Sequence, residues 1–189
     1  MTMVLAVVVG LLVLLAILGG AVVVVYNGFV RSRVRTDEAW SAIDVQLKRR
    51  NDLVPNLVET VRGFAAHERE TLESVIGARA ALQRASGPAE IAEADGVLTK
   101  AIGRLFAVSE AYPALRASEN FLALQKDLYD VEEKIAYARQ FYNRNVLDFN
   151  TRIAVFPKSL IANLFGLEPR QFFEAPGARE AVPVSFASR

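Results

Sequence analysis

Two residue types that carry much of protein chemistry are scarce in this sequence, which has no cysteine and a single histidine, His67. The absence of cysteine excludes disulfide bonds, thiolate metal sites and a cysteine nucleophile. A lone histidine excludes metal sites built from two imidazoles and weakens any case for general-base catalysis. An excess of one charge is also missing, because 22 basic residues nearly cancel 21 acidic ones. The chain therefore offers no field that would attract a polyanion, and we expect no cofactor, no metal, no nucleic-acid partner and no small-molecule substrate.

A long apolar run is present instead. Residues 4–25 form a stretch of 22 residues without a charged side chain. As a helix this stretch would rise about 33 Å, enough to cross a bilayer core of about 30 Å. A cleaved signal peptide is the alternative, but it needs a basic n-region, a shorter apolar stretch and a small-x-small cleavage site. Only Met1-Thr2-Met3 precedes the run and a valine run follows Gly19-Gly20-Ala21, so we predict a retained transmembrane helix.

Basic residues follow the apolar run, whereas none precedes it. Arg31, Arg33 and Arg35 lie within ten residues of its end. The positive-inside rule then predicts that the N-terminus lies outside and that the body of the protein is cytoplasmic. The same arginines can reach anionic lipid headgroups, and Tyr26 and Phe29 suit the membrane interface.

Beyond the run, apolar residues recur in steps of three and four, and no strand-like alternation of useful length appears. This spacing predicts helices that pack in a bundle or coiled coil. Left unbroken, the first helix would extend over residues 30–82, about 80 Å. The remaining helices are predicted over residues 89–110, over residues 121–156 and, after Pro157, over residues 158–165.

The predicted fold is all-α, with an N-terminal transmembrane helix followed by an elongated antiparallel bundle of three long helices plus a short C-terminal helix. We divide the chain into residues 1–26 (N-terminal tail and transmembrane helix), residues 27–165 (bundle) and residues 166–189. The last part holds Pro169, Pro176, Gly177 and Pro183, which is typical of an extended or mobile tail.

The stretch "KRRNDLVPNLV" at residues 48–58 interrupts this pattern with polar residues and a proline. Pro55 has no N–H, so a continuous helix loses its bond to the Asn51 carbonyl and kinks. A helix that restarts with Asp52 as N-cap is the alternative. We favour the kinked, continuous helix because apolar positions stay in step across the proline. Asp52, Asn56 and Arg49 share one side and can bond to each other or to the freed carbonyl.

Arg50 stands in the apolar seam itself, where a buried charge must find partners. Antiparallel packing would offer Asp148 and the asparagines of the last long helix, so we interpret the stretch as a joint that sets the packing register and not as a catalytic centre. Trp40, the only tryptophan, is predicted to be buried in the same seam. The structural and interaction candidates are therefore Trp40, Arg50, Asp52, Pro55, Asn56, Asn143, Asn145 and Asn150.

His67 opens the sequence "HERE", which is similar to the start of a zincin motif, but Thr71 occupies the position of the second histidine. A di-iron bundle would need Glu-x-x-His from two helices. We therefore expect no catalytic residues.

Several longer motifs resemble those of the LemA family. They are Tyr26-Asn27 after the apolar run, "AWSAIDVQLKRRNDLVPNLVETVRGFAAHE", "EAYPALRASENFLALQ", "YNRNVLDFNTRIAVFP" and "QFFE" at the end of the match. The resemblance implies a single-pass bacterial inner-membrane protein with a helical-bundle domain, related to magnetosome membrane proteins of the Q type. It implies no activity and no catalytic residues to carry over. Ala114, where an acidic residue is usual, and the Ala/Pro-rich end beyond Glu174 depart from the family pattern.

Three functions are compatible with these features. The first is a membrane-anchored interaction or scaffold protein, self-associating as a homo-oligomer or bound to a protein partner, with no catalytic activity of its own. The second is an adaptor or accessory subunit of a membrane protease or an envelope stress-response system. The third is a phosphorelay or enzymatic bundle that uses His67, and it has the least support.

Overall fold

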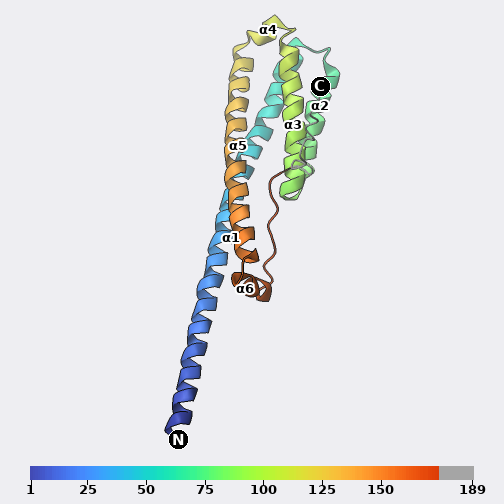
Figure 1. The fold of residues 1–189 in the computed structure, drawn as a ribbon. Coiled ribbons are helices and arrows are strands. Elements are labelled where there is room, and N and C mark those ends of the chain that lie inside the picture. The colour runs from blue at the N-terminus through green and yellow to red at the C-terminus, as the bar shows by residue number, and fades with distance from the viewer. Residues whose placement is uncertain (175–189) are drawn as a thin grey trace, which may run out of the picture. The chain divides into compact units, whose positions relative to one another are not determined.

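The computed structural model describes residues 1–174, and all regular secondary structure in that part of the chain is helical. The helices, shown in Figure 1, are α1 (Thr2–Phe64), α2 (Arg69–Arg84), α3 (Gly87–Ser109), α4 (Pro113–Arg116), α5 (Glu119–Ala154) and α6 (Lys158–Leu164). The predicted fold class, all-α with a long apolar helix at the N-terminus, is confirmed.

α1 contains the predicted membrane span. Within residues 1–174 it is the one helix long and apolar enough to cross a bilayer, and no part of its most apolar stretch is buried. Large apolar side chains from Met3 to Val24 are exposed, as expected of a segment solvated by lipid. From Phe29 onward, α1 instead has buried residues at nearly every turn. One helix therefore passes from the apolar span into packed protein.

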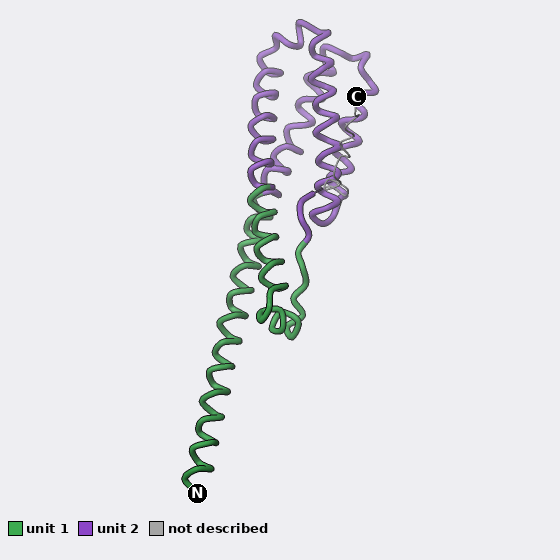
Figure 2. Tube along the Cα trace, in the orientation of Figure 1, with its two compact units in different colours: residues 1–42, 140–170 green, residues 43–139, 171–189 purple. Residues whose placement is uncertain are grey.

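The chain divides into two compact units, which Figure 2 distinguishes by colour. Unit 1 comprises residues 1–42 and 140–170, and unit 2 comprises residues 43–139 and 171–189. α1 and α5 each contribute residues to both units, whereas α2, α3 and α4 belong to unit 2 and α6 belongs to unit 1.

Unit 2 is held together by apolar side chains from the second part of α1, from α2 to α4 and from the first part of α5. The core includes Leu57, Val61, Val75, Leu98, Leu105, Leu115, Phe121 and Leu128. α2 and α3 are joined by two residues, and the chain reverses at Gly87, whose φ of 78° favours a residue without a side chain. Pro88 follows in the first turn of α3, where its missing N–H has no helical partner to lose.

The predicted helix over residues 30–82 is interrupted, which corrects the sequence interpretation. α1 ends at Phe64 and α2 begins at Arg69, with a turn between them. The buried positions stay in step across the turn, from Val61 through Ala65 to Leu72. Because the apolar spacing is preserved and no proline marks the turn, periodicity could not reveal that α2 folds back beside α1.

Unit 1 has a smaller core at the end of the apolar span. Phe29 of α1 packs with Phe149 and Ile153 of α5 and with Ala162 of α6. The segment after α6 is not helical, and Arg170 is the last residue of it that belongs to unit 1. Of the tail predicted over residues 166–189, residues 175–189 lie outside the described part of the chain.

Candidate functional site

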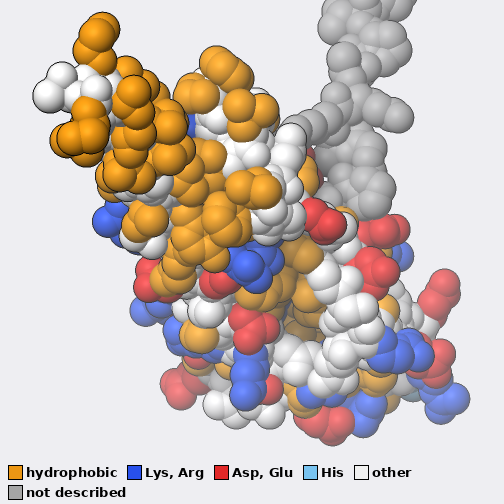
Figure 3. Space-filling view, turned by 90° about the horizontal axis from the view of Figure 1, so that it is seen from below, with side chains coloured by type: hydrophobic (Ala, Val, Ile, Leu, Met, Phe, Trp, Pro, Cys, Tyr) orange, Lys and Arg blue, Asp and Glu red, His pale blue; other side chains and the backbone are white. Residues whose placement is uncertain are grey.

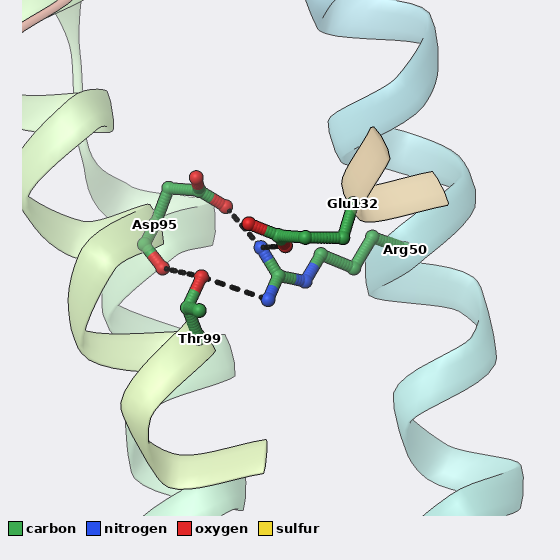
Figure 4. A network of polar contacts seen from close by, with 4 residues as sticks. All are labelled: Arg50, Asp95, Thr99 and Glu132. Carbon is green, nitrogen blue, oxygen red and sulfur yellow. Dashed lines mark hydrogen bonds and ion pairs between the residues drawn. The ribbon is translucent and has the colours of Figure 1, made fainter. Parts of the chain in front are cut away.

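The most densely connected polar site lies in unit 2 and centres on Arg50 of α1. Its Nη1 donates to Asp95 Oδ1 at 2.7 Å and its Nη2 donates to Thr99 Oγ1 at 2.8 Å. The Thr99 hydroxyl in turn donates to the Asp95 backbone carbonyl at 3.0 Å. Glu132 of α5 approaches Arg50 Nη1 to 3.1 Å. Figure 4 shows how these side chains from α1, α3 and α5 converge.

The two central charges of this network are buried, which costs free energy unless they are paired. Only 3% of the Arg50 side chain and 8% of the Asp95 side chain are exposed, whereas 43% of Glu132 is exposed. Burial raises the pKa of the Asp95 carboxyl above its ordinary value of 3.8, the charge of Arg50 opposes that rise, and Glu132 adds to it. Arg50 therefore neutralises a buried carboxylate that would otherwise be costly to ionise.

The pairing with Glu132 is ionic, without hydrogen-bond geometry. Glu132 Oε2 is buried and accepts no hydrogen bond, and Arg50 Nε is likewise buried without an acceptor. The Arg50 guanidinium thus makes two hydrogen bonds to residues of α3 and only an ion pair with Glu132 of α5. This arrangement joins three helices at one level, and its central charges are shielded from solvent, so it is suited to fixing register and not to meeting a substrate.

The partners of Arg50 correct the sequence prediction, which placed them at Asp148 and the asparagines of residues 143–150. Asp148 Oδ2 instead accepts from Arg152 Nε at 2.9 Å. Asn145 Nδ2 donates to the Phe141 carbonyl within α5 at 2.8 Å. Asn150 pairs with the backbone of Arg170, accepting from its N–H at 2.8 Å and donating to its carbonyl at 2.9 Å. The buried charge is matched instead by α3, because which residue faces Arg50 depends on how far each helix is shifted along its neighbour.

The partner residues Asp95, Thr99 and Glu132 were missed by sequence reasoning. A usable signal existed for Asp95, which lies four residues after Ile91 and three before Leu98 in the apolar seam of α3. An acid in one seam and an arginine in another are natural partners, since neither is stable alone in a core. Thr99 and Glu132 carry no comparable signal.

α1 continues through Pro55 without a break, so the predicted continuity of the helix is confirmed over a restart at Asp52, and the kink at Pro55 stays a prediction. The Asn51 carbonyl, which Pro55 leaves without a helical donor, accepts a hydrogen bond from Arg79 Nε of α2 at 3.0 Å. Asp52 and Asn56 are exposed, and it is α2, not one of them, that supplies this donor.

The remaining predicted residues lie in unit 1, apart from His67. Trp40 is partly buried, with its ring 5.3 Å from that of Tyr142, and Asn143 is also partly buried. His67 is exposed in the turn between α1 and α2.

Of the residues predicted at the membrane interface, Arg31, Arg33 and Arg35 are exposed, and Tyr26 lies 4.5 Å from Phe165, ring to ring. Phe29 departs from the prediction of an interface residue, because it is 1% exposed and packs against protein in the unit 1 core.

Comparisons with known proteins match most of the chain. The LemA family model matches residues 39–186. The magnetosome protein MamQ 2 of Paramagnetospirillum magneticum is 26% identical over 175 residues, covering 79% of this chain and 64% of that protein. MamQ of Magnetospirillum gryphiswaldense is 26% identical over 174 residues, covering 78% and 64%. Protein LemA of Metamycoplasma hominis is 25% identical over 153 residues, covering 79% and 68%. The chain thus spans less than two thirds of the length of the MamQ proteins.

Proposed function

Since the chain belongs to the LemA family, as its motifs predicted, we propose that it is a membrane-anchored interaction protein. In this function the apolar span holds the chain in the bilayer, and the helical units self-associate or hold a protein partner at the membrane surface. The protein has no catalytic activity of its own, and the Arg50 network stabilises the fold.

The observation that carries this proposal is the change of environment along α1. Its first turns expose large apolar side chains all round, and its later turns bury a seam of apolar residues that begins at Phe29. A helix that is apolar all round is stable only inside protein or lipid, and no part of the most apolar stretch is buried within the protein. A bilayer therefore completes the environment of this helix.

Exposed apolar side chains on unit 2 support the interaction role. Leu122, Tyr129 and Tyr137 of α5 are 49%, 61% and 74% exposed. Tyr129 stacks on Phe106 of α3 at 5.9 Å, beside a cavity of about 540 Å³ that Phe121 and Arg116 also line. Leu122 and Tyr129 line the same cavity, and contiguous exposed apolar side chains commonly mark protein contacts.

Photocrosslinking in native membranes tests the interaction. A photoreactive amino acid would replace Tyr129 or Tyr137 in a chain co-expressed with a differently tagged copy, and Glu73, exposed on α2, would be the control position. We expect crosslinked species from the α5 positions that contain both tags or one defined partner. A membrane protease in such a species would specify an adaptor role, whereas the absence of any crosslinked species would refute the interaction function.

The proposed location is the inner membrane, with the N-terminus outside and the helical units in the cytoplasm, supported by Arg31, Arg33 and Arg35 after the span. Because the chain has no cysteine, Glu73→Cys supplies a unique thiol. It should resist a membrane-impermeant thiol reagent in intact cells and react after lysis. Labelling in intact cells would reverse the orientation.

A further inference from the structure

The junction of α5 and α6 lies where the apolar span ends. Val25, the last residue of the apolar run, packs against the unit 1 core that contains Phe29, Ile153 and Ala162. One residue later, the ring of Tyr26 lies 4.5 Å from that of Phe165, just after α6. Both contacts are within unit 1, so α6 sits beside the point at which α1 leaves the bilayer.

The side of α6 that faces away from the core is apolar and uncovered. Ala162 is buried and Ile161 is partly buried against the core, but five large side chains around them are exposed. We call these residues the corner patch: Val155, Phe156, Leu160, Leu164 and Phe165, between 47% and 75% exposed. Lys158 is the only charged residue of α6. Figure 3, seen from the membrane end, shows hydrophobic side chains gathered beside those of the N-terminal helix.

We propose that the corner patch is a second membrane contact, which inserts into the interfacial region of the leaflet from which α1 emerges. The inference rests on the proposed function, because it requires that residues 4–25 span a bilayer. The bilayer is the favoured occupant because the patch adjoins the end of the span and so already lies at the depth of the lipid surface. Phe and Leu side chains, such as Phe156, Phe165 and Leu160, are typical of the apolar side that interfacial helices bury at the lipid boundary.

Charge supports the same placement. Four exposed basic side chains lie close in sequence to the two proposed lipid contacts. Near the end of the span these are Arg31, Arg33 and Arg35 of α1, and near the corner patch it is Lys158 of α6. Basic side chains at this level attract anionic headgroups. A single helix leaves an anchored protein free to rotate about the helix axis, so a second contact would fix which side of unit 1 faces the membrane.

Site-directed fluorescence in vesicles tests the inference. Single cysteines at Leu160 and Leu164 of the full chain would carry an environment-sensitive fluorophore, after reconstitution into vesicles of phosphatidylethanolamine and phosphatidylglycerol. Leu14 within the span is the positive control. Glu38 is the negative control, since it is exposed on α1 and lies 13 residues, or about 20 Å, beyond Val25.

We expect probes at positions 160 and 164 to be protected from aqueous iodide and quenched by lipids that carry a nitroxide near the top of the acyl chain. The probe at Glu38 should show the opposite behaviour. Quenching at Leu14 but free access of iodide to Leu160 and Leu164 would overturn the second contact and leave the anchor intact. No lipid quenching at Leu14 would refute the anchor itself.

Protection from iodide without quenching by the labelled lipids would mean that protein covers the patch, and would also overturn the proposal.

A second variant addresses the role of the patch directly. Leu160→Asp with Leu164→Asp changes only exposed side chains, so the helical content should be retained. A probe at Phe156 should then lose its lipid quenching, whereas Leu147→Asp, which changes another exposed leucine of unit 1, should leave it unchanged.

Discussion

Arg79 of α2 donates from Nε to the backbone carbonyl oxygen of Asn51 in α1 at 3.0 Å. In an uninterrupted helix, that carbonyl would accept from the N–H of residue 55, but residue 55 is proline and has no N–H. The side chain of Arg79 thus replaces a helical backbone donor and ties α2 to α1 at the same point. Pro55 leaves the Asn51 carbonyl oxygen of α1 without a backbone donor, and Arg79 of α2 supplies the donor instead.

This relationship predicts a coupling between positions 79 and 55. Arg79→Met keeps the side-chain length but leaves the Asn51 carbonyl without a donor, which should lower the free energy of unfolding by about 1–3 kcal/mol. Pro55→Ala restores a backbone N–H, so Arg79→Met should cost less in that background. Denaturant unfolding of the full chain in detergent, followed by circular dichroism, measures both.

The matched control for this cycle is Arg84→Met, because Arg84 Nε donates to Ala80 O within its own exposed turn and should contribute little. Equal losses for Arg79→Met with and without Pro55 would show that the arginine does not substitute for the missing N–H.

The Arg50 network predicts a large difference between two adjacent arginines. Arg50→Ala would leave the buried Asp95 carboxylate unpaired and should destabilise the protein by about 3–5 kcal/mol. Arg49 pairs with Asp127 at 3.8 Å and both side chains are 46% exposed, so Arg49→Ala should cost roughly 0.2–1 kcal/mol. Melting temperatures of the two variants provide the comparison. Similar stability of both would argue against a structural role for the network.

Replacing both charged residues of the buried Arg50–Asp95 pair should recover part of the stability that Arg50→Ala loses. Arg50→Met fills the apolar seam, and with Asp95→Leu it removes the carboxylate that would be stranded. The double variant should therefore be more stable than Arg50→Ala, since apolar replacement of a buried ion pair is often neutral or stabilising. A double variant no more stable than Arg50→Ala would indicate that the pair contributes more than charge compensation.

The raised pKa of Asp95 predicts the sign of a pH effect. Because the folded state holds the Asp95 proton more tightly than the unfolded chain, this group's contribution to stability is fully present below its unfolded pKa. It is lost as pH rises through the raised folded pKa. Relative to Asp95→Asn, which cannot ionise, the unmodified protein should gain stability as pH falls from neutral towards 4. If the unmodified protein lost stability relative to that variant over this range, the Arg50 charge would outweigh burial.

Trp40 and Tyr142 of unit 1 form an aromatic pair with ring centroids 5.3 Å apart. Since Trp40 is only partly buried, Trp40→Ala should cost less than the 3–5 kcal/mol typical of a fully buried aromatic residue. A double-mutant cycle with Tyr142→Leu should give a coupling of about 0.5–1.5 kcal/mol. A coupling near zero would show that the two rings contribute independently.

Much of the architecture could be predicted because it depends on local spacing. Apolar positions that recur every three or four residues from Phe29 to Val61 indicate a helix, whatever elements pack against it. The all-α class of the fold follows from this spacing. The turn at residues 65–68 was not predicted, since the spacing of buried positions continues through it and its four residues contain neither glycine nor proline; Gly63, two residues earlier, is the one breaker residue near it. Whether such a seam continues as one helix or folds back depends on which packing buries more apolar surface, a property of the whole domain.

By itself, the sequence determined that the chain is helical, that residues 4–25 require an apolar environment and that Arg50 stands in a seam. Each of these depends only on composition or on the period of the α-helix. The tertiary structure alone decided that Arg50 meets Asp95 and not Asp148 or the asparagines of α5. It also decided that Arg79 donates to the carbonyl freed by Pro55 and that the corner patch lies beside the end of the apolar run. The physical reason is that partners distant in sequence are set by the axial register of the helices, and register follows from where the chain turns at residues 65–68 and reverses at Gly87.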